Sequence, residues 1–169
     1  MPDAGGSRLA RMIARLSIQR AHLEEAAKLV GDVPGPVLEI GLGKARTYDH
    51  LCHLMPDREI FAFDGALHCP PAAVPPEEFL IVGDFQDTLA EHRARFEGRA
   101  ALAHCDFGTE DQSHDMAQAA WLADLVAPLM RRDGVVLADR ELALGAGWKP
   151  IEVEVERGPF DYFGWKNFV

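Results

Sequence analysis

The sequence predicts an α/β fold in which parallel strands alternate with helices, and three observations carry this prediction. Short apolar runs alternate with longer stretches of helical periodicity through residues 37–140. Several of these runs are apolar throughout, as strands covered on both faces are. Beyond residue 148 the pattern changes to alternating apolar and polar residues, which is typical of antiparallel strands. We therefore expect a doubly wound sheet of five parallel strands, a C-terminal antiparallel hairpin and an N-terminal helix.

The N-terminal helix is expected over about residues 7–30. Ser7 is a good helix cap because its hydroxyl can accept from a backbone N–H of the first turn, and Gly31 is a typical residue after a helix end. Apolar residues recur between them at three- and four-residue steps. This apolar stripe can pack on the sheet or on a second subunit, which would make a homodimer. The helix can also cover a bound substrate, with Arg8 or Arg11 reaching inward.

The remaining elements follow in order along the chain, which at 169 residues has the length of one domain. Strands are expected at 37–40, 59–64, 79–82, 100–104 and 134–139, and helices at 47–54, 88–96 and 113–130. Ile151, Val153 and Val155 alternate with glutamates, so this stretch reads as a half-exposed strand, and residues 162–168 can return as its partner. One domain over 1–169 would thus combine the helix (about 7–30), a core (about 37–140) and a hairpin (about 148–169).

Charge and hydropathy exclude several classes of partner. Aspartate and glutamate outnumber lysine and arginine by 27 to 17, giving a formal net charge of −10. A nucleic-acid-binding protein needs clustered basic residues to displace counterions, so no nucleic acid is expected. No run approaches the ~18–20 apolar residues that cross a bilayer, so no membrane is expected. The N-terminus lacks the basic-then-apolar layout of a signal peptide, and a cytoplasmic location follows.

The most informative motif is Glu39-x-Gly41-x-Gly43, directly after the first predicted strand. In an open α/β sheet, ligands bind at the carboxyl ends of the strands where the strand order reverses. Glycine allows the backbone to turn tightly and to approach a ligand there. A dinucleotide fingerprint would need a third glycine at the position of Arg46, which disfavours a nicotinamide-dependent oxidoreductase.

An acid two residues before the first glycine, within Val37-Leu38-Glu39-Ile40, resembles the first motif of class I S-adenosylmethionine-dependent methyltransferases. Ala45 occupies the third small position, where that family more often has glycine. The resemblance covers about residues 37–140. It implies a Rossmann-like nucleotide-binding core, S-adenosyl-L-methionine as cofactor, and in-line methyl transfer to a small-molecule acceptor. A catalytically idle module that only binds the cofactor is the alternative.

Polar residues at the strand ends complete the predicted cofactor site. Asp64, 23 residues after Gly41, can accept both ribose hydroxyls, or it is a solvated strand end or helix cap. The family places an adenine contact at Asp84, which can instead cap the next helix. Glu39, if buried, needs a charged or donating partner, and the cofactor ammonium is one candidate. The predicted cofactor-binding residues are Glu39, Gly41, Leu42, Gly43, Thr47, Asp64, Gly65, Ala66, Gly83, Asp84, Phe85 and His104.

Two residues at the exit of the fourth strand, His104 and Asp106, are the predicted catalytic groups. A general base is needed only if the nucleophile arrives protonated, and an imidazole with a pKa of ~6.5 suits that role. His104 as a hydrogen-bonded structural residue is the alternative. His114 and Glu141 are further candidates for the base.

Two features that the sequence lacks narrow the class of methyl acceptor. Asp106 and Asp139 resemble the metal-binding acids of catechol-type methyltransferases, but Arg140 stands where that site needs a carbonyl ligand, and arginine has no acceptor. No metal is therefore expected, and Arg140 can bind a substrate carboxylate or pair with Asp139. The chain also lacks the Asn/Asp-Pro-Pro-aromatic tetrad of base-amino methyltransferases, which favours a small-molecule acceptor.

Overall fold

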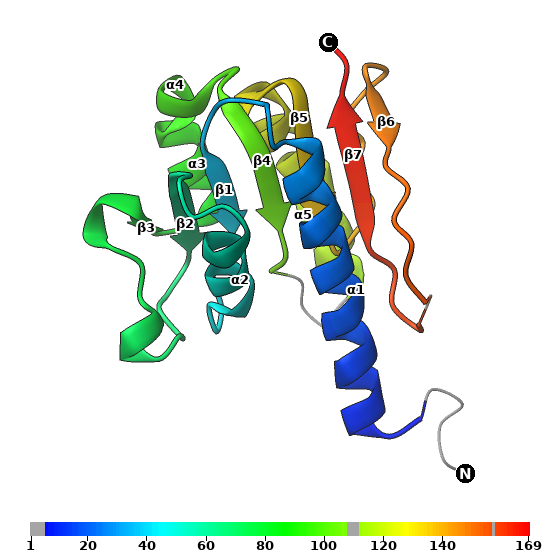
Figure 1. Ribbon diagram of the computed structural model, residues 1–169. Coiled ribbons are helices and arrows are strands. Elements are labelled where there is room, and N and C mark those ends of the chain that lie inside the picture. Colours follow the sequence, from blue (N-terminus) through cyan, green and yellow to red (C-terminus); the bar gives the residue numbers. More distant parts are fainter. Residues whose placement is uncertain (1–5, 108–111, 157) are drawn as a thin grey trace.

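The computed structural model describes residues 6–107, 112–156 and 158–169, with side chains for all of these except 112–115. It contains one seven-stranded sheet in the order β3-β2-β1-β4-β5-β7-β6 (Figure 1). The strands are β1 (Val37–Ile40), β2 (Ile60–Asp64), β3 (Leu80–Val82), β4 (Ala100–Cys105), β5 (Met130–Ala138), β6 (Trp148–Pro150) and β7 (Phe163–Asn167). The helices are α1 (Arg8–Leu29), α2 (Arg46–Leu54), α3 (Phe85–Glu91), α4 (Arg93–Phe96) and α5 (Gln112–Val126), with short 3₁₀ turns η1 (Pro71–Ala73), η2 (Glu77–Phe79) and η3 (Ala127–Leu129).

The strand pairing confirms the predicted architecture. Strands β1 to β5 are all parallel, whereas β7 pairs antiparallel with β5 and β6 pairs antiparallel with β7. Strand β1 lies between β2 and β4, so the strand order reverses at this point. The loop after β1 therefore stands where open α/β sheets bind ligands.

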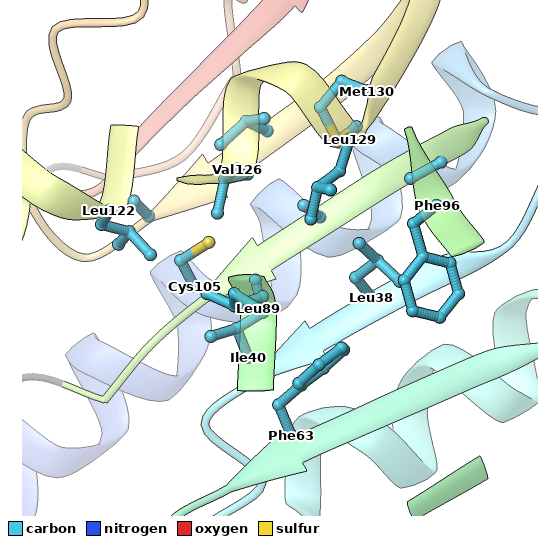
Figure 2. Packing of buried hydrophobic residues seen from close by; sticks show 14 of the residues in the cluster. Leu38, Ile40, Phe63, Leu89, Phe96, Cys105, Leu122, Val126, Leu129 and Met130 are labelled. Atoms are coloured by element: carbon cyan, nitrogen blue, oxygen red, sulfur yellow. The ribbon is translucent and has the colours of Figure 1, made fainter. Parts of the chain in front are cut away.

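Apolar side chains fill both faces of the sheet, because neighbouring residues of a strand point to opposite sides. Leu38, Ile40 and Phe63 pack on one face with α3, α4 and α5, and Figure 2 shows several of their contacts. Val37 and Leu102 pack on the other face with α1 and α2. Burying one such side chain contributes about 1.5–3 kcal/mol to the free energy that stabilises the folded state. The same alternation turns Glu39 and His104 toward the α1 side.

Helix α1 begins as predicted, with the Ser7 hydroxyl accepting from the Ala10 N–H at 3.1 Å. Its first turns extend past the sheet (Figure 1), and Leu9, Met12 and Ile13 remain exposed there. The middle of α1 packs against the sheet, through residues such as Ile18 and Leu23. None of the described helices is long and apolar enough to cross a membrane.

Three predicted boundaries were wrong. The helix expected at 88–96 is two helices, because the chain bends at His92 between α3 and α4. The helix expected to reach residue 130 ends at residue 126, since Pro128 follows in the next turn, and β5 begins already at Met130. The register of β5 against β4 shifts within that early part, where Asp133 has a φ of 65°.

The alternating stretch 151–156 is also not the hairpin strand that its pattern predicts. Its apolar residues are partly buried and its glutamates exposed, as expected, but the ladder with β7 is formed by residues 148–150. Ile151 makes one more backbone bond, from its N–H to the Gly164 carbonyl at 2.9 Å. Beyond it the chain separates from β7 around a cavity, so the burial pattern arises without strand pairing.

Candidate active site

The loop after β1 has the backbone conformation of a ligand cradle. Gly41, Gly43 and Ala45 all have left-handed φ angles, of 101°, 50° and 61°. A Cβ on Gly41 would lie 2.5 Å from the Asp106 carbonyl oxygen, so only glycine fits there. A Cβ on Gly43 would meet nothing within 4 Å, which means that the loop faces open space. This geometry fits a bound nucleoside cofactor, and the φ of Ala45 explains why glycine is common at that position.

Asp64, at the end of β2, holds this loop in place. Its Oδ2 accepts from the Gly43 N–H at 2.7 Å, and its Oδ1 lies 3.4 Å from the Ala66 N–H. A carboxylate has about four acceptor positions, so lone pairs remain for two ribose hydroxyls. A Cβ on Gly65 would also meet nothing within 4 Å, so the space beside Asp64 is open. The ribose contact of Asp64 stays a prediction that this geometry fits.

A buried hydrogen-bonded chain joins Glu39, His104 and Tyr162. Glu39 and His104 are partners in the β1–β4 register, both are fully buried, and Glu39 Oε2 lies 2.7 Å from His104 Nδ1. The Thr47 hydroxyl donates to the other Glu39 oxygen, and His104 Nε2 is hydrogen-bonded to the Tyr162 hydroxyl. Glu39 therefore has partners within the protein, and both nitrogens of His104 are occupied.

The charges around this chain set its protonation. Burial lowers the pKa of His104, but the charge and hydrogen bond of Glu39, together with the charges of Asp106 and Asp139, outweigh burial, so its pKa is raised. Burial, followed by the nearby carboxylates, raises the pKa of Tyr162 well above its usual value, so the phenol keeps its proton at neutral pH. The Nδ1–H of His104 donates to Glu39. Nε2 accepts from Tyr162 when the imidazole is neutral and donates to it when the imidazole is protonated.

Asp106, the second predicted base, contacts α1. Its Oδ1 pairs with the Arg15 guanidinium at 2.9 Å and its Oδ2 accepts from the Gln19 amide. The helix thus reaches the site through Arg15 and Gln19. The inward reach of Arg8 or Arg11 stays a prediction. Burial raises the pKa of Asp106, although the neighbouring His104 acts to lower it. These contacts favour an anchoring role for Asp106, and its role as a base stays a prediction.

The predicted adenine-binding residues lie beside α3. Asp84 caps this helix, because its Oδ1 accepts from the N–H groups of Gln86 and Asp87 at 2.9 and 3.3 Å. Phe85 stacks on Phe107, which follows β4, with ring centroids 4.3 Å apart. The capping alternative is therefore realised at Asp84. The predicted adenine contacts of Gly83, Asp84 and Phe85 stay predictions, as does the cofactor contact of Leu42, which is buried.

The residues after β5 lie beside the end of β4, where the Asp139 N–H donates to the Cys105 carbonyl at 3.3 Å. Arg140 Nε lies 2.8 Å from Asp139 Oδ1, so the predicted alternative of an ion pair between these two residues is realised. Arg140 Nη1 also donates to the Gln118 side-chain oxygen at 2.7 Å. Across the described residues, no group of three His, Cys, Asp or Glu side chains could hold a metal ion. The side chain of His114 lies outside the described part of the chain. Glu141 lines the cavity described next.

A cavity of about 670 Å³ opens between α1 and the segment that connects β6 to β7. Tyr162 lines it, so this residue belongs both to the cavity and to the buried chain with His104. Sequence reasoning missed this role of Tyr162. The one signal in the sequence was its place in an aromatic run beside Phe163. Neighbouring residues of a strand point to opposite faces of the sheet, and no pattern revealed which of the two faces would contact His104.

The comparisons with known proteins show the family of the chain. The family model for S-adenosyl-L-methionine methyltransferases matches residues 6–161. An S-adenosyl-L-methionine methyl transferase from Silicibacter pomeroyi DSS-3 is 32% identical, with a TM-score of 0.87 over 96% of this chain and 99% of that one. The chain therefore belongs to the S-adenosyl-L-methionine methyltransferase family.

Two more distant structures share the fold. Cofactor-bound Rv0187 from MTB is 16% identical, with a TM-score of 0.62 over 99% of this chain and 83% of that one. Human methyltransferase-like protein 13 in complex with S-adenosylhomocysteine (SAH) is 13% identical, with a TM-score of 0.59 over 92% and 81%. No significant match was found among curated proteins. The predicted fold, the enzyme class and S-adenosyl-L-methionine as cofactor are thus confirmed.

Proposed function

We propose that this methyltransferase acts on a small-molecule acceptor. The observation that carries the proposal is the cavity of about 670 Å³, which shares Tyr162 with the buried chain to Glu39. Small-molecule sites are usually clefts of about 300–1,000 Å³. The net charge of −10 supports the proposal, since it opposes binding to a nucleic acid.

The cofactor would be held by the residues around the β1 loop. Gly41 and Gly43 would offer their backbone to its amino-acid part, Asp64 would accept its ribose hydroxyls, and Asp84 with Phe85 would border its adenine. When bound, S-adenosyl-L-methionine supplies an activated methyl group on a sulfonium. The protein then needs chiefly to hold a nucleophile in line, which is worth up to ~7–11 kcal/mol in favourable cases.

The two predicted catalytic residues take different parts in this proposal. His104 can receive a proton only through the Tyr162 hydroxyl, because its other nitrogen faces Glu39. Asp106 holds α1 over the site through Arg15. A proton leaving the acceptor would therefore pass to His104 and not to Asp106.

Cofactor binding is tested by calorimetry with SAH and NAD on the wild type and on Asp64→Ala. Asp64→Ala should weaken SAH binding at least tenfold, because it removes the ribose acceptor and the brace on the Gly43 N–H. Asp57→Ala is the matched control, since Asp57 is exposed in the turn at the opposite end of β2. Unchanged SAH affinity in Asp64→Ala would remove this residue from the site.

The acceptor is tested by screening metabolites for release of SAH from S-adenosyl-L-methionine. Turnover of one or more small molecules is expected. Saturable SAH binding without turnover of any of them, in a screen that spans amines, alcohols, acids and thiols, would favour the idle binding module and refute the proposal.

A further inference from the structure

The wall of the cavity brings together groups that accept hydrogen bonds. Ile18 and His22 of α1 form one side, and residues 150–155 and 160–165 form much of the other. The rings of His22 and Tyr162 lie 4.9 Å apart on this wall. Since Tyr162 also contacts His104, a ligand in the cavity that reaches the Tyr162 hydroxyl would be linked through it to the buried chain.

Acidic side chains predominate among the described residues of the wall. Its acidic residues are Glu141, Glu152, Glu154 and Asp161, and no lysine or arginine is among the described residues that line it. One cation reaches the rim, where the Arg11 guanidinium lies 5.9 Å from the centre of the Phe160 ring. Among the described residues of the wall and its rim, four acids stand against one arginine, and this excess of negative charge attracts a cation and repels an anion.

A second observation points to the same kind of ligand. His22 is only 7% exposed, and its Nδ1 lies 2.9 Å from the Ile18 carbonyl oxygen. Burial lowers the pKa of His22, and this effect exceeds the opposing one of the Ile18 carbonyl, so the imidazole is neutral. A carbonyl only accepts, so the proton is on Nδ1 and Nε2 carries a lone pair. No described residue donates to that Nε2, so its lone pair is available to a ligand in the cavity.

Tyr162 adds a third acceptor. Its hydroxyl has one proton and two lone pairs, and the proton is used toward His104 when the imidazole is neutral. The oxygen can then accept from a ligand. Aromatic residues of the wall, Trp165 among them, can in addition attract a cation through their ring faces. Lone pairs, carboxylates and aromatic faces all suit a protonated amine.

We propose that the methyl acceptor is a small amine, which binds in this cavity as an ammonium and gives its proton to Tyr162. One ammonium proton passes to the Tyr162 oxygen while the Tyr162 proton passes to His104 Nε2, which leaves an imidazolium facing the Glu39 carboxylate. The freed nitrogen lone pair forms the new N–C bond, and the electron pair of the broken C–S bond stays on sulfur. The product leaves as a methylammonium, and His104 returns its proton to water through Tyr162.

This inference rests on the proposed function, and binding of charge-matched probes tests it separately. Phenethylamine, 2-phenylethanol and phenylacetate are titrated into the protein, with and without saturating SAH, and their binding is measured by calorimetry. The amine should bind about tenfold more tightly than the alcohol, with the carboxylate weakest. Equal binding of amine and alcohol, beside a normal SAH isotherm, would overturn the inference alone. Absence of SAH binding would instead overturn the proposed function.

A matched pair of variants assigns the amine to the cavity. Glu154→Gln should weaken phenethylamine binding about two- to fivefold, the value expected for one partly solvated charge. Glu156→Gln is the control, because Glu156 is exposed on the same segment and does not line the cavity. Equal effects of the two variants would place the amine elsewhere and refute the site.

The role of Tyr162 is tested by the imidazole signals of His104 in nitrogen-15 NMR. Phenethylamine should shift these signals in the wild type and leave them unchanged in Tyr162→Phe, which keeps the ring and removes only the hydroxyl. A merely structural Tyr162 would leave the response of His104 to the amine in place. That result would remove Tyr162 from the proton path.

Discussion

The buried pair of Glu39 and His104 makes a strong prediction about stability. In Glu39→Gln, the amide keeps the shape of the side chain but removes its charge. The carboxylate of the wild type accepts from the Thr47 hydroxyl and the His104 Nδ1–H, and both residues of the pair are fully buried. The amide oxygen of the variant can still accept from Thr47, but its NH₂ group then faces Nδ1. The imidazole must therefore carry its proton on Nε2, which donates to Tyr162.

The expected loss of stability follows from these contacts. Breaking a buried charged pair costs about 3–5 kcal/mol, and the changed tautomer regains one hydrogen bond worth about 0.5–1.5 kcal/mol. A net loss of about 2–4 kcal/mol should therefore appear in urea unfolding at pH 6. For a chain of this size it should lower Tm by about 4–16 °C.

The pH dependence identifies the pair as the cause. The folded pKa of His104 is raised, so its contribution to stability is complete below the ordinary imidazole pKa of about 6.5 and is lost as the pH rises through the folded value. Glu39→Gln should weaken this decline, because burial, which lowers the pKa of His104, is then opposed only by the charges of Asp106 and Asp139. Glu59→Gln is the control, since Glu59 is exposed just before β2. Parallel stability curves for wild type and Glu39→Gln above pH 6 would refute the reasoning.

Further predictions concern the loop and its anchor on α1. Gly41→Ala should cost more stability in urea unfolding than Gly43→Ala, because only the first Cβ meets backbone, 2.5 Å from the Asp106 carbonyl oxygen. Both positions have a positive φ, so the strain of about 1–3 kcal/mol that alanine meets there is common to the two variants. Equal losses would contradict this. Arg15→Met should leave the Asp106 carboxylate without its ion pair and speed amide hydrogen exchange in the first half of α1. Arg20→Met is the control on the same helix, where a 3.7 Å surface pair contributes little, and equal exchange in both variants would refute the anchor.

The elements that could be predicted from the sequence are those determined by neighbouring residues. The apolar run 37–40 with its glycines fixed β1 and the loop, and Ser7 marked the start of α1. Pro128, which follows α5, could have been used to predict the end of this helix correctly. The position of β6 could not be derived, because alternation reports which side chains are buried, and residues 151–156 obtain that burial beside a cavity without pairing.

The same distinction between local patterns and distant contacts holds for the functional site. The loop and Asp64 could be predicted because they lie within one βα unit and carry a recurring pattern. The partners of Asp106 and His104 could not, since Gln19 is 87 residues from Asp106 and Tyr162 is 58 residues from His104 in the sequence. Such contacts depend on how α1 and β7 dock onto the sheet, and no local pattern encodes that docking.

The chain of Glu39, His104 and Tyr162 has a consequence for the order in which the enzyme can be assembled. Glu39 is made early in synthesis, whereas Tyr162 is made only after β5 has formed the edge against which β7 packs. Until that last strand docks, the imidazole beside Glu39 has no partner for its outer nitrogen and the cavity has no second wall. The interior of the first five strands can pack earlier, but a growing chain would gain its complete active site only after β7 has been made and has docked on β5.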